Sequence, residues 1–484
     1  METFKIDFAV QRGPIKRMNA VNNGPSAPNV RTTTKSNFDL YKAIEIPYAR
    51  NHDASFSDIY GGEHGVDVHR IFKNFDADEN DPANYIFEPT DKGVLNTFAA
   101  GTKVFYRLGA SIEHHYKYGV RVPKDFAKWA RICEHIIRHY NEGWANGYEL
   151  GIEYWEIWNE PDICPPGPDN ACWQGDEDQF VDLYCTAAKH LKECFPHLKI
   201  GGPAFANPFD GDFQRKLFEG IKKTGAPLDF YSYHCYARDI NWFGQVMTDV
   251  RTFVNNYGYP EAETILDEWN YIDGWRDERW EYSILAEQHL KGASFIAGAM
   301  AVGQASPLDM LMYYDARPCV MNGIFTMDHK PRKGYYCYTM FKRLKDLGTY
   351  VPHEREGEDV FACTATDGKK HAIMLTYFNN DKKGLFDVAY KAYRDAEDTP
   401  DEVPFIVAYH DTLRLAKQGK AEGVDHTQVT LDLKHIGGPA KVTYYCLDDL
   451  HSDEKVLEET IEGDTTLTLD MELFSTYLIE ITPQ

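Results

Sequence analysis

The sequence lacks the features that place a protein in a membrane or on nucleic acid. It has no run of 18 apolar residues, so no membrane span is expected. Basic residues are scarce, because 51 Lys and Arg stand against 75 Asp and Glu, and the formal charge is −24. A chain with this charge repels phosphate backbones, which argues against nucleic acid as a partner. The charge fits a soluble enzyme with an uncharged substrate.

Signal-like and metal-binding patterns are also missing. Residues 1–7 contain no apolar signal stretch, which predicts a cytoplasmic protein; the alternative is an exported protein whose signal peptide has been removed. The ten cysteines form no CxxC pair, so a zinc site is not expected and most should be reduced thiols. Cys164 and Cys172 bracket a Pro/Gly loop and could bridge in an oxidising compartment. No cofactor or metal is expected, since the acidic residues 76–81 lack a calcium-loop spacing.

Strand and helix patterns alternate regularly from about residue 43 to 346. The chain of 484 residues is long enough for two domains, one of them large. Between the apolar segments, hydrophobic residues recur at helical spacing, most clearly at 126–140 and 180–194. The eight candidate strands are Ala43–Ala49, Asp67–Phe72, Thr102–Leu108, Glu153–Trp158, Lys199–Pro203, Leu228–His234, Glu263–Asp267 and Met310–Tyr314. Eight strand–helix units predict an α/β fold of the (β/α)8 TIM-barrel type.

The pattern changes from about Thr349, where alternating strands separated by charged turns predict a β-sandwich. The strand-like segment Phe4–Val10 is expected to dock onto it, and the charge-rich stretch 390–403 is expected to be an exposed loop. The predicted domains are therefore an N-terminal strand in residues 1–15, a catalytic barrel in 16–348 and a β-sandwich in 349–484.

Two carboxylates follow two of the predicted barrel strands. Glu160 comes after the fourth strand and Glu268 after the seventh. In a TIM barrel the active site lies at the C-terminal ends of the strands, and strands four and seven face each other across the mouth. Glycoside hydrolysis needs two such carboxyl groups, one that protonates the leaving oxygen and one that attacks the anomeric carbon or activates water.

The competing interpretation of each glutamate is a solvent-exposed loop residue, which is the usual place for Glu. Here both follow strands, and Trp and Asn flank both, in Trp158-Asn159-Glu160 and in Glu268-Trp269-Asn270. This context favours the catalytic interpretation. A carbohydrate-binding protein on an inactive barrel is the alternative of another class. It predicts the loss of one carboxylate, and both are present.

With these motifs the sequence resembles the clan A glycoside hydrolases, and within them glycoside hydrolase family 39, which contains β-xylosidases and α-L-iduronidases. The resemblance covers nearly the whole chain. Trp158-Asn159-Glu160-Pro161 is similar to the family's acid/base motif, which implies Glu160 as acid/base and Asn159 as the partner of the sugar 2-hydroxyl. The segment 266–270, Leu-Asp-Glu-Trp-Asn, is similar to the nucleophile strand and implies Glu268 as the nucleophile.

Further residues are expected around the sugar by the same resemblance. The sixth-strand segment 229–236 implies that His234 and Tyr236 lie beside the nucleophile, and the first-strand end implies Arg50 and His52 at the border of the sugar site. His234 could instead be a core histidine, and Arg50 and His52 could brace the barrel mouth. The family's eighth strand commonly carries Tyr-Trp, and Tyr314 stands here in place of the Trp. Trp269, Trp275 and Trp280 follow the nucleophile strand, and each is a candidate either for stacking on the substrate or for packing under a loop. Trp269 is included among the site residues.

The sequence therefore predicts a retaining, exo-acting O-glycosidase of β-xylosidase type. Retention predicts carboxyl groups about 5–5.5 Å apart, against about 6.5–9.5 Å for inversion. The same mechanism on an α-L-iduronide, an α-L-arabinofuranoside or a short β-oligosaccharide, with endo action included, stays open. A uronic acid would require a Lys or Arg facing the sugar C5 substituent. The expected partner is a carbohydrate, and the resemblance allows a homo-oligomer.

Overall fold

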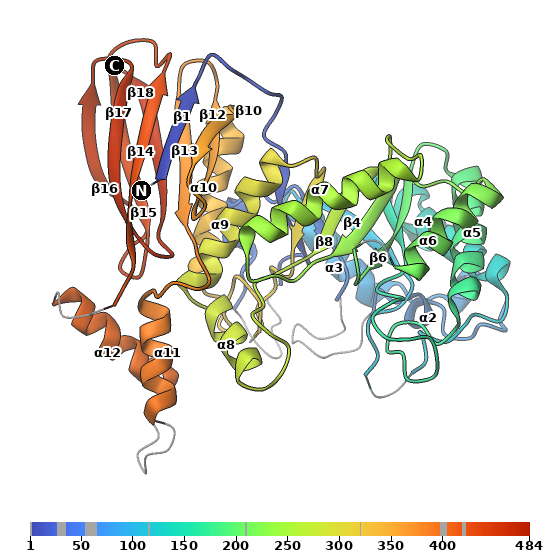
Figure 1. Ribbon diagram of the computed structural model, residues 1–484. Helices are drawn as coiled ribbons and strands as arrows, with labels where there is room; N and C mark the ends of the chain where they lie inside the picture. Colours follow the sequence, from blue (N-terminus) through green and yellow to red (C-terminus); the bar gives the residue numbers. More distant parts are fainter. Residues whose placement is uncertain are drawn as a thin grey trace.

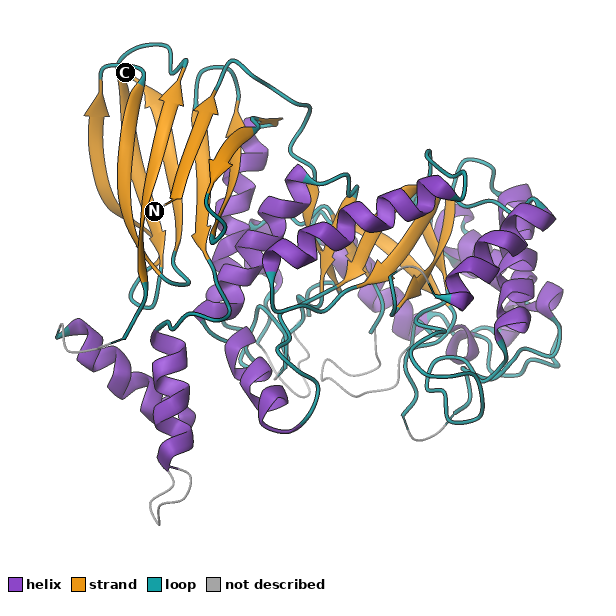
Figure 2. Cartoon of the chain, viewed as in Figure 1, coloured by secondary structure: helices purple, strands orange, loops and turns teal. Residues whose placement is uncertain are grey.

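The computed structural model describes residues 2–26, 35–53, 65–114, 117–208, 211–319, 321–396, 404–418 and 423–484. A barrel surrounded by helices lies beside two packed β-sheets (Figures 1 and 2). Among the residues that the structure describes, no helix is long and apolar enough to cross a bilayer.

Eight parallel strands close into a barrel, which confirms the predicted TIM-barrel fold. Side chains from alternate positions fill the interior, including Tyr48, Phe105, Tyr154 and Phe230, so the barrel is a packed core rather than a pore. The strands are β2 (Arg17–Asn22), β3 (Tyr48–Arg50), β4 (Lys103–Leu108), β5 (Tyr154–Ile157), β6 (Lys199–Phe205), β7 (Phe230–His234), β8 (Glu263–Glu268) and β9 (Met310–Tyr313).

Helices follow the strands, and local sequence signals set their ends. The helix α4 begins after Asp125, whose side chain accepts from the N–H of Lys128, and ends at Gly143 in the left-handed region. A reciprocal capping box of Asp176 and Gln179 starts α5. The helices of the barrel are α1 (Phe38–Ala43), α2 (Val68–Ile71), α3 (Glu88–Ala99), α4 (Phe126–Glu142), α5 (Glu177–Cys194), α6 (Asp212–Thr224), α7 (Ile240–Asn256), α8 (Asp277–Glu287), α9 (Leu290–Ala305) and α10 (Lys333–Leu347), with 3-10 turns η1 (Pro82–Asn84) and η2 (Trp144–Asn146).

One of the eight predicted strands was wrong, and a second was placed too early in the chain. The segment 67–72 contains the one-turn helix α2, which is too short to show helical spacing, and only the end of 43–49 belongs to a strand. The true first strand, β2, was missed because its polar residues interrupt the apolar pattern by which a buried strand is recognised. Arg17 reaches the Tyr154 hydroxyl at 2.7 Å, and Asn22 donates to the carbonyl of Asp267 at 2.7 Å. One omission and one false strand cancel, so β5 and β8 are still the fourth and seventh strands.

The second part of the structure is a sandwich of a four-stranded and a six-stranded sheet. The predicted docking of the N-terminal strand is confirmed, because β1 (Glu2–Asp7) runs antiparallel to β11 and parallel to β14. Phe4 and Ile6 of β1 are buried between the sheets. The sheet orders are β11 (His353–Glu356), β1, β14 (His426–Lys434), β17 (Thr465–Glu472), and β10 (Thr349–Tyr350), β12 (Val360–Thr366), β13 (His371–Tyr377), β18 (Thr476–Pro483), β15 (Ala440–Leu447), β16 (Ser452–Ile461).

The loop predicted at 390–403 is also corrected. Its first residues belong to helix α11 (Leu385–Ala396), which packs through Phe386 and Tyr390 on Phe405 of α12 (Phe405–Lys417); residues 397–403 lie outside the described part. Both helices project from the end of the sandwich (Figure 1). The disulfide considered for the 164–172 loop does not form, since both cysteines are free thiols.

The barrel and the sandwich meet along α9, whose side chains are buried on nearly all faces. Ser294 of α9 bonds the Thr376 hydroxyl at 2.8 Å, and Lys291 pairs with Asp387 at 3.2 Å. A helix that is apolar all round is typical of a buried position. The domain boundaries at 15 and 348 stay a prediction.

Candidate active site

Side chains from the C-terminal ends of β3, β5, β7 and β8 converge at the barrel mouth. Each of the two predicted catalytic glutamates is buried there, Glu160 at 9% and Glu268 at 7% exposure. The backbone turns sharply at the end of β5, because Trp158 and Glu160 adopt positive φ values of 83° and 45°. Such strained conformations concentrate at functional sites.

His234 lies between the two glutamates. Its Nδ1 is 2.8 Å from Oε1 of Glu160, and its Nε2 is 3.6 Å from Oε2 of Glu268. One oxygen of each glutamate and one nitrogen of His234 all lie within 4.8 Å of one another. The structure thus brings together three of the residues expected in the site.

Burial shifts the pKa values of Glu160 and His234 in opposite directions. Removal from water raises the pKa of Glu160 to about 7, against the opposing charge of Arg50. Removal from water also lowers the pKa of His234 to about 4, so the imidazole is neutral at neutral pH. The Glu160 carboxyl can therefore hold a proton beside an uncharged ring.

Glu268 is held by donors that favour its ionised form. The Tyr236 hydroxyl donates to Oε1 at 2.5 Å, and Arg50 donates from Nη1 to Oε2 at 3.3 Å. Burial and the negative charge of Glu160 raise the pKa of Glu268, while Arg50 and the hydrogen bond from Tyr236 oppose that rise. The Tyr236 bond places that phenol beside the predicted nucleophile.

Arg50 lies beneath both glutamates and joins the strands around the mouth. Its side chain is fully buried and donates to Asn159 Oδ1 at 2.6 Å, to Glu156 Oε2 at 2.8 Å and to Asn22 Oδ1 at 3.2 Å. Sequence reasoning placed Arg50 at the border of the site. The structure places it at the centre of a charge network.

Two members of that network were not predicted. Glu156 and Asp267 are both fully buried, and both face the Arg50 Nε, at 2.8 and 3.1 Å. Arg50 and other donors hold the pKa of Glu156 below its usual range in spite of burial. Burial and the negative charge of Glu156 raise the pKa of Asp267 well above its usual range. Asp267 therefore keeps its proton to a higher pH than an ordinary aspartate.

A slip in strand pairing explains how Asp267 enters this network. The register of β7 and β8 shifts between the pairs Tyr233–Leu266 and His234–Glu268. Consecutive residues on a regular strand point to opposite faces, and an extra residue of this kind re-aims a side chain. Asp267 and Glu268 can therefore both reach Arg50. Glu156 could have been suspected from its place two residues after Tyr154 on β5, which fills the barrel interior.

His52 and Tyr314 lie at the side of the mouth, with their rings 6.4 Å apart. Arg107 donates to the His52 carbonyl at 2.9 Å, and the Tyr314 hydroxyl accepts from Arg317 at 3.3 Å. Arg317 also pairs with Asp53 at 2.9 Å. These residues form a polar wall next to the glutamates.

Trp269 is not brought into this group, which corrects the expectation that it stacks on a substrate. Its side chain is completely buried. The indole packs against Phe243, Phe295 and Tyr313 behind the strands. Trp269 directly follows the last residue of β8, and its ring lies on the outer side of the barrel among residues of α7 and α9.

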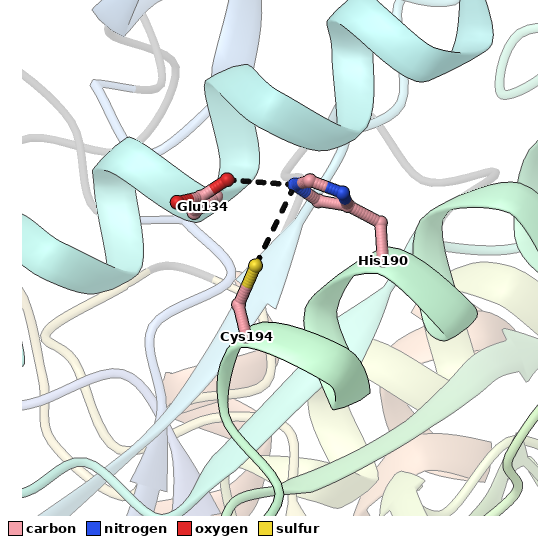
Figure 3. A group of neighbouring side chains, drawn as sticks. All are labelled: Glu134, His190 and Cys194. Atoms are coloured by element: carbon pink, nitrogen blue, oxygen red, sulfur yellow. Dashed lines mark hydrogen bonds and ion pairs between the residues drawn. The ribbon is translucent and has the colours of Figure 1, made fainter.

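Metal-ligating atoms also gather away from the mouth. In the described chain, Glu134, His190 and Cys194 meet between α4 and α5 (Figure 3), and a second group is Cys446, Asp448 and His451. His190 Nε2 lies 2.7 Å from Glu134 Oε2 and 3.8 Å from Cys194 Sγ. Arg138 donates to the other oxygen of Glu134 at 2.8 Å. These mutual bonds account for the grouping without an ion.

Comparison with known proteins confirms the resemblance inferred from the motifs. The model of the glycosyl hydrolases family 39 matches residues 38–265. A β-xylosidase of Caldicellulosiruptor saccharolyticus is 30% identical over 142 residues, covering 29% of this chain and 26% of that protein. A β-xylosidase of Geobacillus stearothermophilus is 26% identical over 356 residues, covering 65% of this chain and 66% of that protein.

The fold has close counterparts among solved structures. The crystal structure of a glucosidase from Croceicoccus marinus matches 100% of this chain and 99% of its own with a TM-score of 0.73, at 23% identity. At this identity the likeness concerns the fold. The family match includes Glu160, His234 and Tyr236 but ends before Glu268, so the interpretation of Glu268 depends on its geometry.

The raised pKa of Asp267 predicts how the free energy of unfolding depends on pH. Its folded-state pKa lies above the ordinary 3.8, so the unfolded chain releases this proton first and the carboxyl costs stability as the pH rises above about 4. Asp267→Asn removes that titration. Urea unfolding from pH 4 to 8 measures this effect. As the pH rises, the free energy of unfolding of the variant should increase relative to that of the wild type by up to about 1.4 kcal/mol per pH unit.

The matched control is Asp470→Asn, because the Asp470 side chain is 74% exposed on β17. Its free energy of unfolding should stay within about 0.5 kcal/mol of wild type across this range. A difference between Asp267→Asn and wild type that does not change with pH would show that Asp267 is ionised in the folded protein.

Proposed function

We propose that this chain is a retaining glycoside hydrolase that releases terminal β-linked sugars from β-xyloside-type substrates. The observation that carries the proposal is the pair of buried glutamates at the ends of β5 and β8, with oxygens within 4.8 Å of each other. Their proximity matches the about 5–5.5 Å of retaining enzymes better than the about 6.5–9.5 Å of inverting ones.

In the proposed mechanism Glu160 and Glu268 act in two displacements. Glu160 transfers its proton to the glycosidic oxygen while Glu268 attacks the anomeric carbon, so the bond to the leaving alcohol breaks as a glycosyl ester forms. Glu160, now ionised, takes a proton from water, and the water oxygen displaces Glu268. The raised pKa of Glu160, about 7, suits a group that serves first as acid and then as base.

The surrounding residues prepare this chemistry. Tyr236 aims its O–H and Arg50 an N–H at Glu268, which favours the ionised form of that carboxyl and fixes its direction. Arg50 donates a hydrogen bond to the side-chain oxygen Oδ1 of Asn159. The side-chain N–H groups of Asn159 are therefore the atoms that can donate to a sugar hydroxyl. Neutral His234 orients Glu160 without adding charge.

The relatives and the charge of the mouth support a neutral sugar. Two relatives are named β-xylosidases. Arg317, the cation nearest to Tyr314, is already paired with Asp53 and Asp315 at 2.9 and 3.0 Å. A uronic acid needs a cation for its carboxylate, so this pairing favours a xyloside over an iduronide.

Removing either carboxyl should abolish turnover. With an aryl β-xyloside, Glu160→Gln should lower kcat/KM by about 10²–10⁴, because the leaving oxygen loses its proton donor. Glu268→Gln should lower it at least as far, because no glycosyl ester can form. The control is Glu261→Gln, an exposed residue in the turn before β8 at the opposite end of that strand.

A panel of aryl glycosides, assayed by release of the chromophore, checks this prediction. Turnover of no sugar by the wild type would overturn the proposed activity. Rates in both Gln variants equal to that of Glu261→Gln would overturn the assignment of the site.

The pKa of Glu160 predicts the alkaline limit of activity. The acid must be protonated, so kcat/KM for an aryl β-xyloside should fall about tenfold per pH unit above about pH 7. A β-xylosyl fluoride, whose leaving group needs no proton, should lack this fall. Initial rates with the aryl β-xyloside and with the fluoride, measured between pH 5 and 9, check this prediction. An equal fall of kcat/KM for the fluoride at alkaline pH would contradict the role of Glu160.

A further inference from the structure

Trp275 is an exposed aromatic ring close to the proposed nucleophile. It lies in the loop between β8 and α8, and 57% of its surface is exposed, in contrast to the buried Trp269. A single large apolar side chain on the surface is common and does not by itself indicate a binding site. The residues around Trp275 are therefore the evidence for its role.

The neighbours connect Trp275 to Glu268 through one residue. The rings of Trp275 and Tyr236 are 4.9 Å apart in an edge-to-face arrangement of 78°. The Tyr236 hydroxyl donates to Glu268 at 2.5 Å. The exposed indole is thus separated from the nucleophile by the width of a single phenol ring.

The ring is also held in place before any ligand arrives. Trp280 of α8 stacks on Trp275 at 5.4 Å and 24°, which covers one face of the indole. The loop is anchored by Asp273, which binds Arg238 at 3.1 Å and Arg279 at 2.8 Å. Its backbone N–H donates to Ser283 at 2.9 Å. A ring fixed in this way binds a ligand at little cost in conformational entropy.

We propose that Trp275 forms a binding subsite for a pyranose ring of an oligosaccharide, on the leaving-group side of the bond that is cut. This inference rests on the proposed function. The C–H face of a neutral sugar fits a flat apolar ring, and an exo-acting enzyme places its further sugars beyond the scissile bond. The anchored platform beside Tyr236 would align that bond with Glu160 and Glu268.

The experiment compares two substrates that differ in this subsite. β-Xylosyl fluoride carries no ring on the leaving-group side, whereas xylotriose carries two. Trp275→Ala should lower kcat/KM for xylotriose at least about tenfold and leave the value for the fluoride within about twofold. Trp275→Tyr, which keeps a ring, should recover most of the loss.

The outcomes separate a subsite from a structural role. If Trp275 only supports Tyr236, both substrates should lose activity equally in Trp275→Ala, and the proposal falls; unchanged rates on both also overturn it. The control is Leu457→Ala, which removes an exposed apolar side chain from β16 in the sandwich and should change neither rate.

Binding distinguishes this inference from the proposed function. If the wild type turns over neither substrate, the proposed function fails, and calorimetric titration with xylotriose decides the inference alone. A dissociation constant at least about tenfold weaker in Trp275→Ala than in wild type supports the subsite. Equal binding, or none to wild type, overturns it.

Discussion

The guanidinium of Arg50 compensates the negative charge buried at the barrel mouth. It faces Glu156, Asp267 and Glu268 and also holds Asn159, so it touches strands β5 and β8 from its own place on β3. One positive charge cannot balance three buried carboxylates, and burying unpaired charge is costly. The pKa values of the three carboxyl groups respond to this conflict. That of Glu156 is lowered by Arg50, whereas those of Asp267 and Glu268 are raised by burial. The shared arginine joins the strand ends at the place where a substrate would bind.

The same burial differentiates the two glutamates at the mouth. The carboxyl of Glu160 contacts the neutral imidazole of His234, and burial is the main cause that raises its pKa. Glu268 meets a phenol and a guanidinium, which stabilise the charged form. In the proposed mechanism, these different environments assign the proton donor to Glu160 and the attacking anion to Glu268. The barrel provides these environments by ending two strands that face each other across the mouth in different polar surroundings, without using different residue types.

Sequence reasoning located Glu160 and Glu268 because a polar residue after an apolar strand is a local signal. It also identified the sandwich and the docked strand β1 from alternation alone. It failed where structure depends on neighbours that are distant in the chain. The register slip that admits Asp267 exists only when β7 and β8 are paired. Trp269 directly follows β8 and is buried by rings behind the strands, whereas Trp275 lies in the loop before α8 and is exposed. This difference depends on packing that only the folded chain provides. The one-turn helix α2 and the polar strand β2 carry too little periodicity to be recognised.

The central claim is a double displacement at two glutamates held close together, and the stereochemistry of the first product tests it most directly. Proton NMR during hydrolysis of an aryl β-xyloside, recorded before mutarotation, distinguishes the two anomers. The account predicts that β-xylose appears first, because two inversions at the anomeric carbon restore the starting configuration. Initial release of α-xylose would show a single displacement by water, and would contradict the role of Glu268 as a nucleophile.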